Sequence, residues 1–140
     1  MAKGSIHCTI VSPERPLFDG QVDRISVPGA EGELGFLPHH APLIGALGPG
    51  LVRLHQGDHV ERLAIRGGFV HVKKDVVTLL VTDAVRPADI DRAQLEADHA
   101  AVREALHHPR SDAEFEELLL ERRWCEVREH MLAEASRITI

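Results

Sequence analysis

The sequence predicts an α+β fold, in which an N-terminal antiparallel β-sandwich or barrel is followed by a C-terminal antiparallel two-helix hairpin. Two changes of pattern predict it. Up to Val85 the apolar residues alternate with polar ones, as in strands, and after Pro87 they recur with the period of helices. The helical part is interrupted at Pro109, which divides it into two helices. We therefore expect two domains, residues 1–86 and residues 87–140.

The first domain is expected to contain short strands that are separated by turns. Apolar and polar residues alternate over 6–10, and Gln56-Gly57-Asp58 has the composition of a turn between two further alternating runs. Arg66-Gly67-Gly68 is expected to break the pattern, which resumes at Phe69. Few aromatic residues are available, so the core is expected to be aliphatic. The remaining strands are expected at 22–27, 51–56, 60–65, 69–72 and 76–82.

The run from Pro28 to Gly50 is dense in glycine and proline. Glycine adopts backbone angles that are closed to other residues, and proline fixes its own φ and lacks a donor. We therefore expect a connection with a closely determined path. It would present Glu31 and Glu33 at a tip between two strands.

The second domain is expected to form an αα-hairpin, because only a few residues separate its two helices. Asp89 is the expected N-cap of the first helix, and Ser111 or Asp112 that of the second, which runs to about Ala135. Alanines recur at every fourth position of the first helix and would allow close helix approach with little hydrophobic stabilisation. Those alanines are Ala93, Ala97, Ala101 and Ala105. The apolar stripe expected on the second helix is Leu120, Trp124, Val127 and Met131.

Composition excludes several classes of function. The net charge of −6 and the lack of a basic cluster argue against nucleic-acid binding. No apolar run approaches the ~20 residues that cross a bilayer. Cys8 and Cys125 stand far apart and are expected to be reduced core thiols. The ten histidines have no partners at zinc-ligand spacing, and no hydrolase or metalloprotease motif is present, so we expect no metal and no catalytic site.

An ordered set of motifs gives the chain a family resemblance. An opening segment at 10–20, the run Arg66–Val70 and a two-helix tail accompany a glycine- and proline-rich motif in the middle. Together they resemble the epsilon subunit of the bacterial F-type ATP synthase. The central motif consists of Gly29, Gly32, Leu34, Gly35, Pro38, His40, Pro42, Leu43, Pro49 and Gly50.

This resemblance implies a non-catalytic subunit of the central stalk, or rotor, which couples ion translocation to ATP synthesis. The sandwich would bind the gamma subunit and rest on the c-subunit ring. The helices would fold against the sandwich, or extend into the alpha/beta catalytic head and inhibit ATP hydrolysis. The chain would lie at the cytoplasmic face of the bacterial inner membrane and meet the membrane only through the complex.

The resemblance also implies contact residues. The loop that meets the c-ring corresponds to Ala30, Glu31, Gly32 and Glu33. Ser12, His40 and Pro42 are the candidates for contact with the gamma subunit. Basic residues that act in inhibition correspond to Arg122, Arg123 and Arg128, although glutamates make the second helix acidic.

Some bacterial epsilon subunits bind ATP through an Ile/Leu-Asp-x-x-Arg-Ala motif at the first helix. Ile90 and Asp91 match that motif, but Gln94 stands where arginine is expected. Arg92 comes two residues early, which turns it about 200° away on a helix. We therefore expect no cofactor and no bound ATP.

The residues leave one alternative to a rotor subunit. A stand-alone protein-binding module, consisting of a β-sandwich with a helical appendage, fits the same pattern. Such a module would be a stable monomer with no affinity for a gamma subunit.

Overall fold

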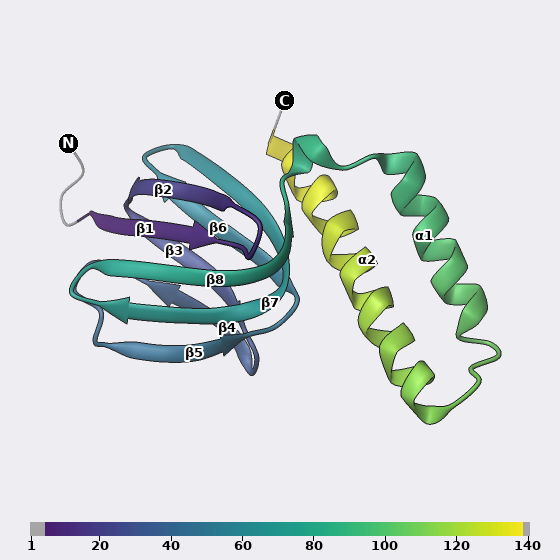
Figure 1. The fold of residues 1–140 in the computed structure, drawn as a ribbon. Coiled ribbons are helices and arrows are strands. Elements are labelled where there is room, and N and C mark those ends of the chain that lie inside the picture. The colour runs from purple at the N-terminus through teal and green to yellow at the C-terminus, as the bar shows by residue number, and fades with distance from the viewer. Residues whose placement is uncertain (1–4, 139–140) are drawn as a thin grey trace. The chain divides into compact units, whose positions relative to one another are not determined.

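The computed structural model describes residues 5–138, with side chains placed up to Ser136. The described residues form two compact units that divide between Val85 and Arg86, and Figure 1 shows the elements of each. The elements are β1 (Ile6–Val11), β2 (Pro16–Val22), β3 (Arg24–Gly29), β4 (Gly32–Phe36), β5 (Leu43–Leu47), β6 (Gly50–Gln56), β7 (His59–Lys73), β8 (Val76–Val85), the 3-10 helix η1 (Pro87–Asp89), α1 (Arg92–Ala105) and α2 (Asp112–Ile138).

The eight strands of the first unit form one sheet that folds into two layers, as expected for a sandwich (Figure 1). Its strand order is β2-β1-β8-β7-β5-β3-β4, with β6 paired to both β3 and β7. One pair departs from the antiparallel expectation, since β1 and β8 run parallel, with Cys8 opposite Val77. Strands so far apart in the sequence pair through tertiary packing, which local alternation does not reveal.

Strand β7 continues through the glycine pair where the sequence predicted a break. Its first half pairs with β6 and its second half with β5, so β7 passes from one layer to the other. At the crossing Gly68 has a φ of +146°, and a Cβ there would collide with the carbonyl oxygen of Leu80. The prediction of a break was wrong because the glycines permit a bend and a close strand approach within one strand.

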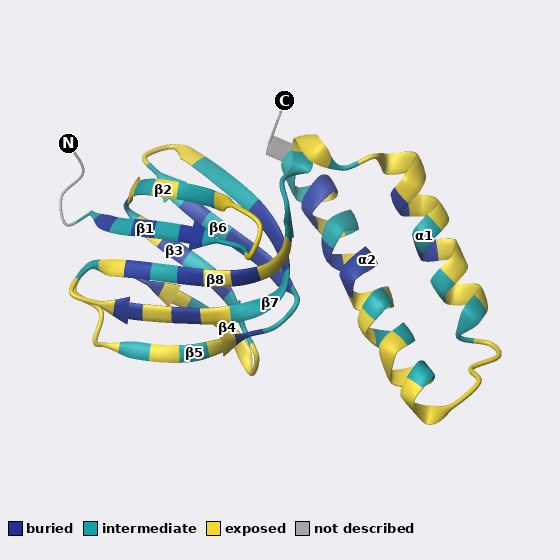
Figure 2. Ribbon diagram, viewed as in Figure 1, coloured by how far each residue is buried: buried dark blue, intermediate teal, exposed yellow. Residues whose placement is uncertain are grey.

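The core of the first unit fills the space between the two layers. Buried and exposed residues alternate along β8, and Figure 2 shows the same alternation as bands of dark blue, teal and yellow. The core is mainly aliphatic, as predicted, and Phe36 is its aromatic member. Cys8 and Cys125 are both free and buried, as predicted for cysteines of the core.

The glycine- and proline-rich run contains two strands, β4 and β5, where the sequence predicted a single connection. Glu31 lies in the turn that joins β3 to β4, but Glu33 lies inside β4. The rest of the run forms the β4–β5 loop, residues 37–42, and a short turn before β6. Both strands are only five residues long and contain glycine, so they give a weaker alternation signal than the longer strands.

The N-cap of α1 differs from the predicted residue, whereas that of α2 is one of the two expected. Asp89 belongs to η1, and α1 begins at Arg92 with Asp91 as its N-cap, which accepts a hydrogen bond from the Gln94 amide at 3.1 Å. Ser111 was one of the two expected caps of α2, and its hydroxyl accepts from the backbone N–H of the third helical residue at 3.1 Å.

The alanine stripe of α1 does not form the helix seam. Ala93, Ala97 and Ala101 are exposed, whereas Leu95 and His99 are buried. Leu95 packs with Cys125 and Leu132 of α2, and Ile90 packs against this cluster. Leu95 is buried in place of the alanines because the free energy of burial grows with apolar area. In α2, Leu120 was also expected in the seam and is exposed.

Candidate functional site

The β3–β4 hairpin forms the candidate ring-contact loop. Gly29 pairs with Gly32, so Ala30 and Glu31 alone make the turn. Gly32 has a φ of +143°, and a Cβ on Gly29 would collide with the carbonyl oxygen of Gly32. The sequence Gly-Ala-Glu-Gly thus builds a tight tip that only glycine allows at both ends. It leaves the Glu31 carboxylate exposed at the turn.

This tip is held from one side by the connection between β5 and β6. The Ala30 amide donates to the Ala46 carbonyl at 3.0 Å, and the Gly48 amide donates to the Pro28 carbonyl at 2.9 Å. A shallow pocket of about 310 Å³ lies between the tip and β5, lined by residues 29–34 with Gly45 and Ala46. The hairpin is therefore a fixed projection from the sheet.

The other side of the tip is held by an ion pair across the sheet. Arg53 of β6 lies 3.0 Å from the Glu33 carboxylate, and its side chain is 22% exposed. Between them stands Ser26 of β3, which pairs with Arg53 on one side and with Gly35 on the other. These two small residues leave room for the guanidinium to cross β3. Glu33 is therefore paired, which leaves Glu31 as the carboxylate at the turn.

The candidate gamma-contact residues have their polar groups satisfied locally. The Ser12 hydroxyl donates to the Arg15 carbonyl at 3.1 Å, which closes the turn between β1 and β2. His40 Nδ1 donates to the Ala41 carbonyl at 2.7 Å, and its ring meets Phe36 edge-on, with centroids 4.9 Å apart. Pro42 is exposed just before β5. The hydroxyl of Ser12 and Nδ1 of His40 are therefore bonded within their own loops, and the Pro42 ring is open to solvent.

The structure adds a feature that the sequence analysis missed, an exposed apolar row on the outer face of the sandwich. Phe69 of β7 stands opposite Ala46 of β5 and Leu80 of β8, and Leu80 stands opposite Val11 of β1. Ile44 lies on the same face of β5 and is 75% exposed, while Phe69 is 59% and Leu80 53% exposed. We call Ile44, Ala46, Phe69 and Leu80 the outer strip.

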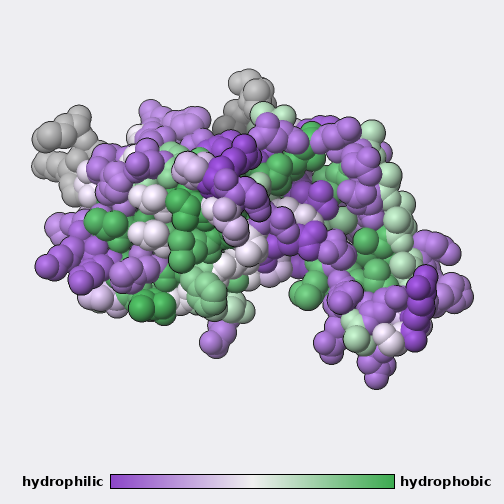
Figure 3. Space-filling view, in the orientation of Figure 1, coloured by the Kyte–Doolittle hydropathy of each residue, from purple (hydrophilic) through white to green (hydrophobic). Residues whose placement is uncertain are grey.

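Figure 3 shows hydrophobic surface over β7 and β8, the strands that carry Phe69 and Leu80. Contiguous exposed apolar surface marks interaction sites on proteins. Two of the candidate gamma-contact residues flank the strip, since Ser12 follows β1 at one edge and Pro42 precedes β5 at the other. The alternation of each strand pointed to this face, but the strip appears only when the strand order is known.

The candidate nucleotide residues serve the structure of the helical unit. Ile90 packs against the helix seam, Asp91 caps α1, and Arg92 donates to the Ser136 hydroxyl at 3.5 Å. Gln94 donates to the Asp98 carboxylate at 2.8 Å. A groove of about 300 Å³ between the helices is lined by Arg92, Leu95, Glu96, Glu129, Leu132 and Ala133. The groove thus carries two carboxylates and one guanidinium.

The three candidate basic residues of α2 do not share a face. Arg122 and Arg123 are exposed, and Arg123 lies 3.9 Å from Glu126. Arg128 is half-buried, with its guanidinium 5.0 Å from the Trp124 ring centroid and a hydrogen bond to the Trp124 carbonyl at 3.3 Å. Six residues on a helix turn Arg128 well away from Arg122. Of the three candidates, only Arg122 and Arg123 are therefore exposed.

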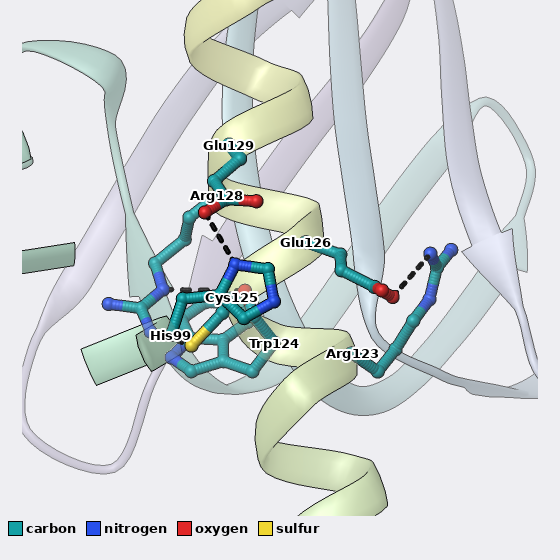
Figure 4. A network of polar contacts seen from close by, with 7 residues as sticks. All are labelled: His99, Arg123, Trp124, Cys125, Glu126, Arg128 and Glu129. Carbon is teal, nitrogen blue, oxygen red and sulfur yellow. Dashed lines mark hydrogen bonds and ion pairs between the residues drawn. The ribbon is translucent and has the colours of Figure 1, made fainter. Parts of the chain in front are cut away.

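A polar contact across the helix seam was not foreseen. His99 Nδ1 of α1 lies 2.6 Å from a carboxylate oxygen of Glu129 of α2, and the imidazole is 11% exposed. Figure 4 shows Glu129 pointing to the ring of His99, beside Cys125 and Arg128. The two groups lie on different helices, so their pairing ties α1 to α2. A histidine at a seam position was the available signal in the sequence.

No metal-binding group and no spanning helix is found in the part of the chain that the structure describes. There, no three histidine, cysteine, aspartate or glutamate side chains gather closely enough to hold a metal ion. No helix within residues 5–138 is both long and apolar enough to cross a membrane.

The fold and its surfaces define a class of protein: a β-sandwich with an exposed apolar strip and a braced hairpin, joined to a pair of helices. Exposed apolar surface of this kind is typical of proteins that bind other proteins. Residues 5–87 match the family described as "ATP synthase, Delta/Epsilon chain, beta-sandwich domain".

Similar proteins agree with this match. Over 87 residues the chain is 46% identical to the ATP synthase epsilon chain of Halalkalibacterium halodurans. The aligned residues cover 62% of this chain and 65% of that relative. Over 113 residues it is 36% identical to the ATP synthase epsilon chain of Leptospira interrogans, covering 81% and 87%. A chain in the structure of the Euglena gracilis mitochondrial ATP synthase, OSCP/F1/c-ring, is similar with a TM-score of 0.83 at 25% identity, covering 94% and 84%.

The chain therefore belongs to the family of ATP synthase epsilon chains. Members of this family are non-catalytic subunits of the rotor stalk, and the resemblance stated from the sequence is confirmed.

Proposed function

We propose that this chain joins the gamma subunit to the c-ring in the central stalk of a bacterial F-type ATP synthase. It would work at the cytoplasmic face of the inner membrane and couple ion translocation to ATP synthesis. The observation that carries the proposal is the outer strip, which lies between Ser12 and Pro42, the residues that the family resemblance assigns to the gamma contact.

Burial of the outer strip by a protein partner would be energetically favourable. Fully burying one large apolar side chain contributes about 1.5–3 kcal/mol relative to leaving it exposed. Ile44, Phe69 and Leu80 are each more than half exposed and stand on neighbouring strands. A complementary apolar surface on the gamma subunit would gain several such contributions at once. Ser12 and Pro42 would then lie at the rim of the interface.

The test is binding to the cognate catalytic head, with its gamma subunit, after its epsilon subunit has been removed. Phe69→Glu puts a charge in the middle of the strip and is expected to weaken binding about a hundredfold or more, since a buried unpaired charge is costly. His59→Glu is the matched control, because His59 is an exposed residue on the same strand but belongs to the β6 pairing. Equal binding by the two variants would rule out the strip.

A stand-alone binding module would give another outcome. The wild-type chain would then be a monomer that does not bind the head at all. Binding of wild type together with loss in Phe69→Glu distinguishes the rotor subunit from that alternative.

We also propose that the β3–β4 tip meets the polar loops of the c-ring, mainly through Glu31. The tip is held by Ala46 and Gly48 on one side and by Arg53 on the other, so it would transmit force without bending. Glu31→Lys is expected to reduce ATP-driven ion pumping while binding to the isolated head is unchanged. Glu14→Lys is the control, because Glu14 is an exposed acid in the β1–β2 turn.

For the helical unit we propose a contact with the alpha/beta head in which Arg122 and Arg123 act and Arg128 does not. Arg122 and Arg123 are exposed, whereas the guanidinium of Arg128 lies over the Trp124 ring. The double variant Arg122→Ala with Arg123→Ala is expected to raise ATP hydrolysis by the rebuilt head at least twofold if the helices inhibit, since charge pairs supply part of the contact. Unchanged hydrolysis would remove these residues from the contact.

We propose that the chain works without a bound nucleotide. The groove beside Arg92 carries Glu96 and Glu129, which repel phosphate. Calorimetry with Mg-ATP is expected to detect no binding to wild type. Gln94→Arg supplies the arginine that the family motif contains and serves as the comparison. Binding by the wild-type chain would contradict the proposal.

A further inference from the structure

Three of the four non-glycine residues with left-handed backbone in the described part of the chain lie at or next to one contact, that between His39 and Asp75. His39 has a φ of 68°, Lys74 of 50° and Asp75 of 62°. His39 lies in the β4–β5 loop, and the other two form the turn between β7 and β8. Such conformations persist where the surrounding structure determines them, and they concentrate at functional positions.

Asp75 is the centre of this contact. Its carboxylate accepts a hydrogen bond from the His39 amide at 2.5 Å, and its other oxygen lies 3.3 Å from His39 Nδ1. Its backbone carbonyl accepts from the His7 amide, at the start of β1, at 2.9 Å. One residue therefore joins three segments that are distant in the sequence. We call the Asp75–His39 contact the clasp.

The hydrogen bond to the His39 backbone amide is the stronger of the two parts of the clasp. The Asp75 side chain is 33% exposed, whereas that of His39 is 80% exposed. An ion pair with so exposed an imidazole contributes little. A charge-assisted hydrogen bond to a backbone amide is short and strong, and it fixes the chain directly. The hydrogen bond from the His39 amide to the Asp75 carboxylate is thus the part that holds the loop.

The turn itself does not require a carboxylate. Lys73 pairs with Val76, so Lys74 and Asp75 form a two-residue turn with positive φ at both positions. Such turns match the twist of the strands, and glycine serves best at these positions. Aspartate tolerates the conformation, so here the turn also supplies an acceptor for the neighbouring loop.

We infer that Asp75 is a positioning residue for the partner-binding face. The clasp holds residues 37–42, which carry His40 and Pro42 and lead directly into Ile44 of the outer strip. With the loop held, the start of β5 and the rim residues present one preorganised surface, and binding does not have to order them. This inference rests on the proposed contact with the gamma subunit.

The experiment compares Asp75→Gly with Lys74→Gly. Both place glycine in the same turn and relieve a positive φ, but only Asp75→Gly removes the clasp. Two quantities are measured: the hydrogen exchange rate of the His39 amide in the free chain, and the affinity for the cognate head without its epsilon subunit. Asp75→Gly is expected to speed exchange about tenfold and to weaken binding about five- to tenfold, the scale of one charge-assisted hydrogen bond. Lys74→Gly is expected to change neither.

Asp75→Asn separates positioning from charge. The amide oxygen still accepts from the His39 N–H and asparagine tolerates left-handed backbone, so binding within about twofold of wild type is expected. Binding as weak as in Asp75→Gly, with the His39 amide still protected, would mean that the charge acts on the partner directly and would overturn the inference.

Two further outcomes are decisive. If Asp75→Gly speeds exchange but binds like Lys74→Gly, the clasp does not prepare the surface. If exchange is unchanged, the clasp does not hold the loop. Failure of the wild-type chain to bind the head is a failure of the proposed function instead, and the exchange rates still judge whether the clasp holds the loop.

Discussion

Gly68 shows how one residue determines the path of a strand. Its φ of +146° and the nearby Leu80 carbonyl leave no space for a side chain. Gly68→Ala is expected to destabilise the chain by about 2–4 kcal/mol, because strain and a collision add. Gly57→Ala, at a φ of +61° with open space around it, is expected to cost about 1 kcal/mol. Chemical denaturation of both variants tests this, and equal losses would contradict the role given to the collision.

Cys8 gives a prediction about pH. Burial, and to a smaller extent the charge of Asp19, raises the pKa of its thiol from an ordinary value of 9.0 to about 12. Between these values the unfolded thiol releases its proton and the folded one keeps it, so stability falls as pH rises through this window and does not change below it. The loss approaches about 1.4 kcal/mol per pH unit. Denaturation at about pH 8 and about pH 10.5 should show a slope that Cys8→Ala lacks; equal slopes would mean that Cys8 titrates normally.

At the scale of elements, a small apolar cluster and a polar pair hold the α1–α2 seam, and the Arg92–Ser136 hydrogen bond joins the same two helices. Leu95, Cys125 and Leu132 form the cluster, and His99–Glu129 is the pair. The Cys125 thiol, whose pKa is raised mainly by burial, lies in this seam and reports its opening. His99→Ala is expected to speed labelling of Cys125 by a thiol reagent about five- to tenfold, since a buried hydrogen bond is lost.

His130→Ala is the matched control for this labelling. His130 lies 3.7 Å from Glu134, but both residues belong to α2, so their pair does not cross the seam. In His130→Ala the labelling rate of Cys125 should stay within about twofold of wild type. Equal acceleration by the two variants would show that the His99–Glu129 pair does not hold α1 to α2.

The elements also show where sequence patterns were sufficient. Long alternating runs predicted β1, β6 and β8, and the capping motif at Ser111 predicted the start of α2, because these signals are local. The alanine spacing of α1 pointed to the wrong face, since Leu95 and His99 lie in the seam and the alanines do not. Only the partner helix decides which stripe is buried.

At the scale of the whole molecule, motifs predicted the family, but residues that act through tertiary contacts stayed hidden. Ile44, Phe69 and Leu80 are ordinary strand residues until the order β5-β7-β8-β1 places them on one face. Asp75 and His39 are 36 positions apart in the sequence. Sequence motifs named the candidate contacts, and the sheet topology added the surface that lies between them.

The most direct test of the account is ion pumping by membranes whose ATP synthase has lost its epsilon subunit. The intact chain and the chain truncated after Val85 are expected to restore ATP-driven pumping, because the sandwich carries both proposed contacts. Phe69→Glu is expected not to restore it. Restoration by Phe69→Glu as complete as by wild type, or no restoration by the wild-type chain, would contradict the claim that this sandwich couples the stalk through its outer strip.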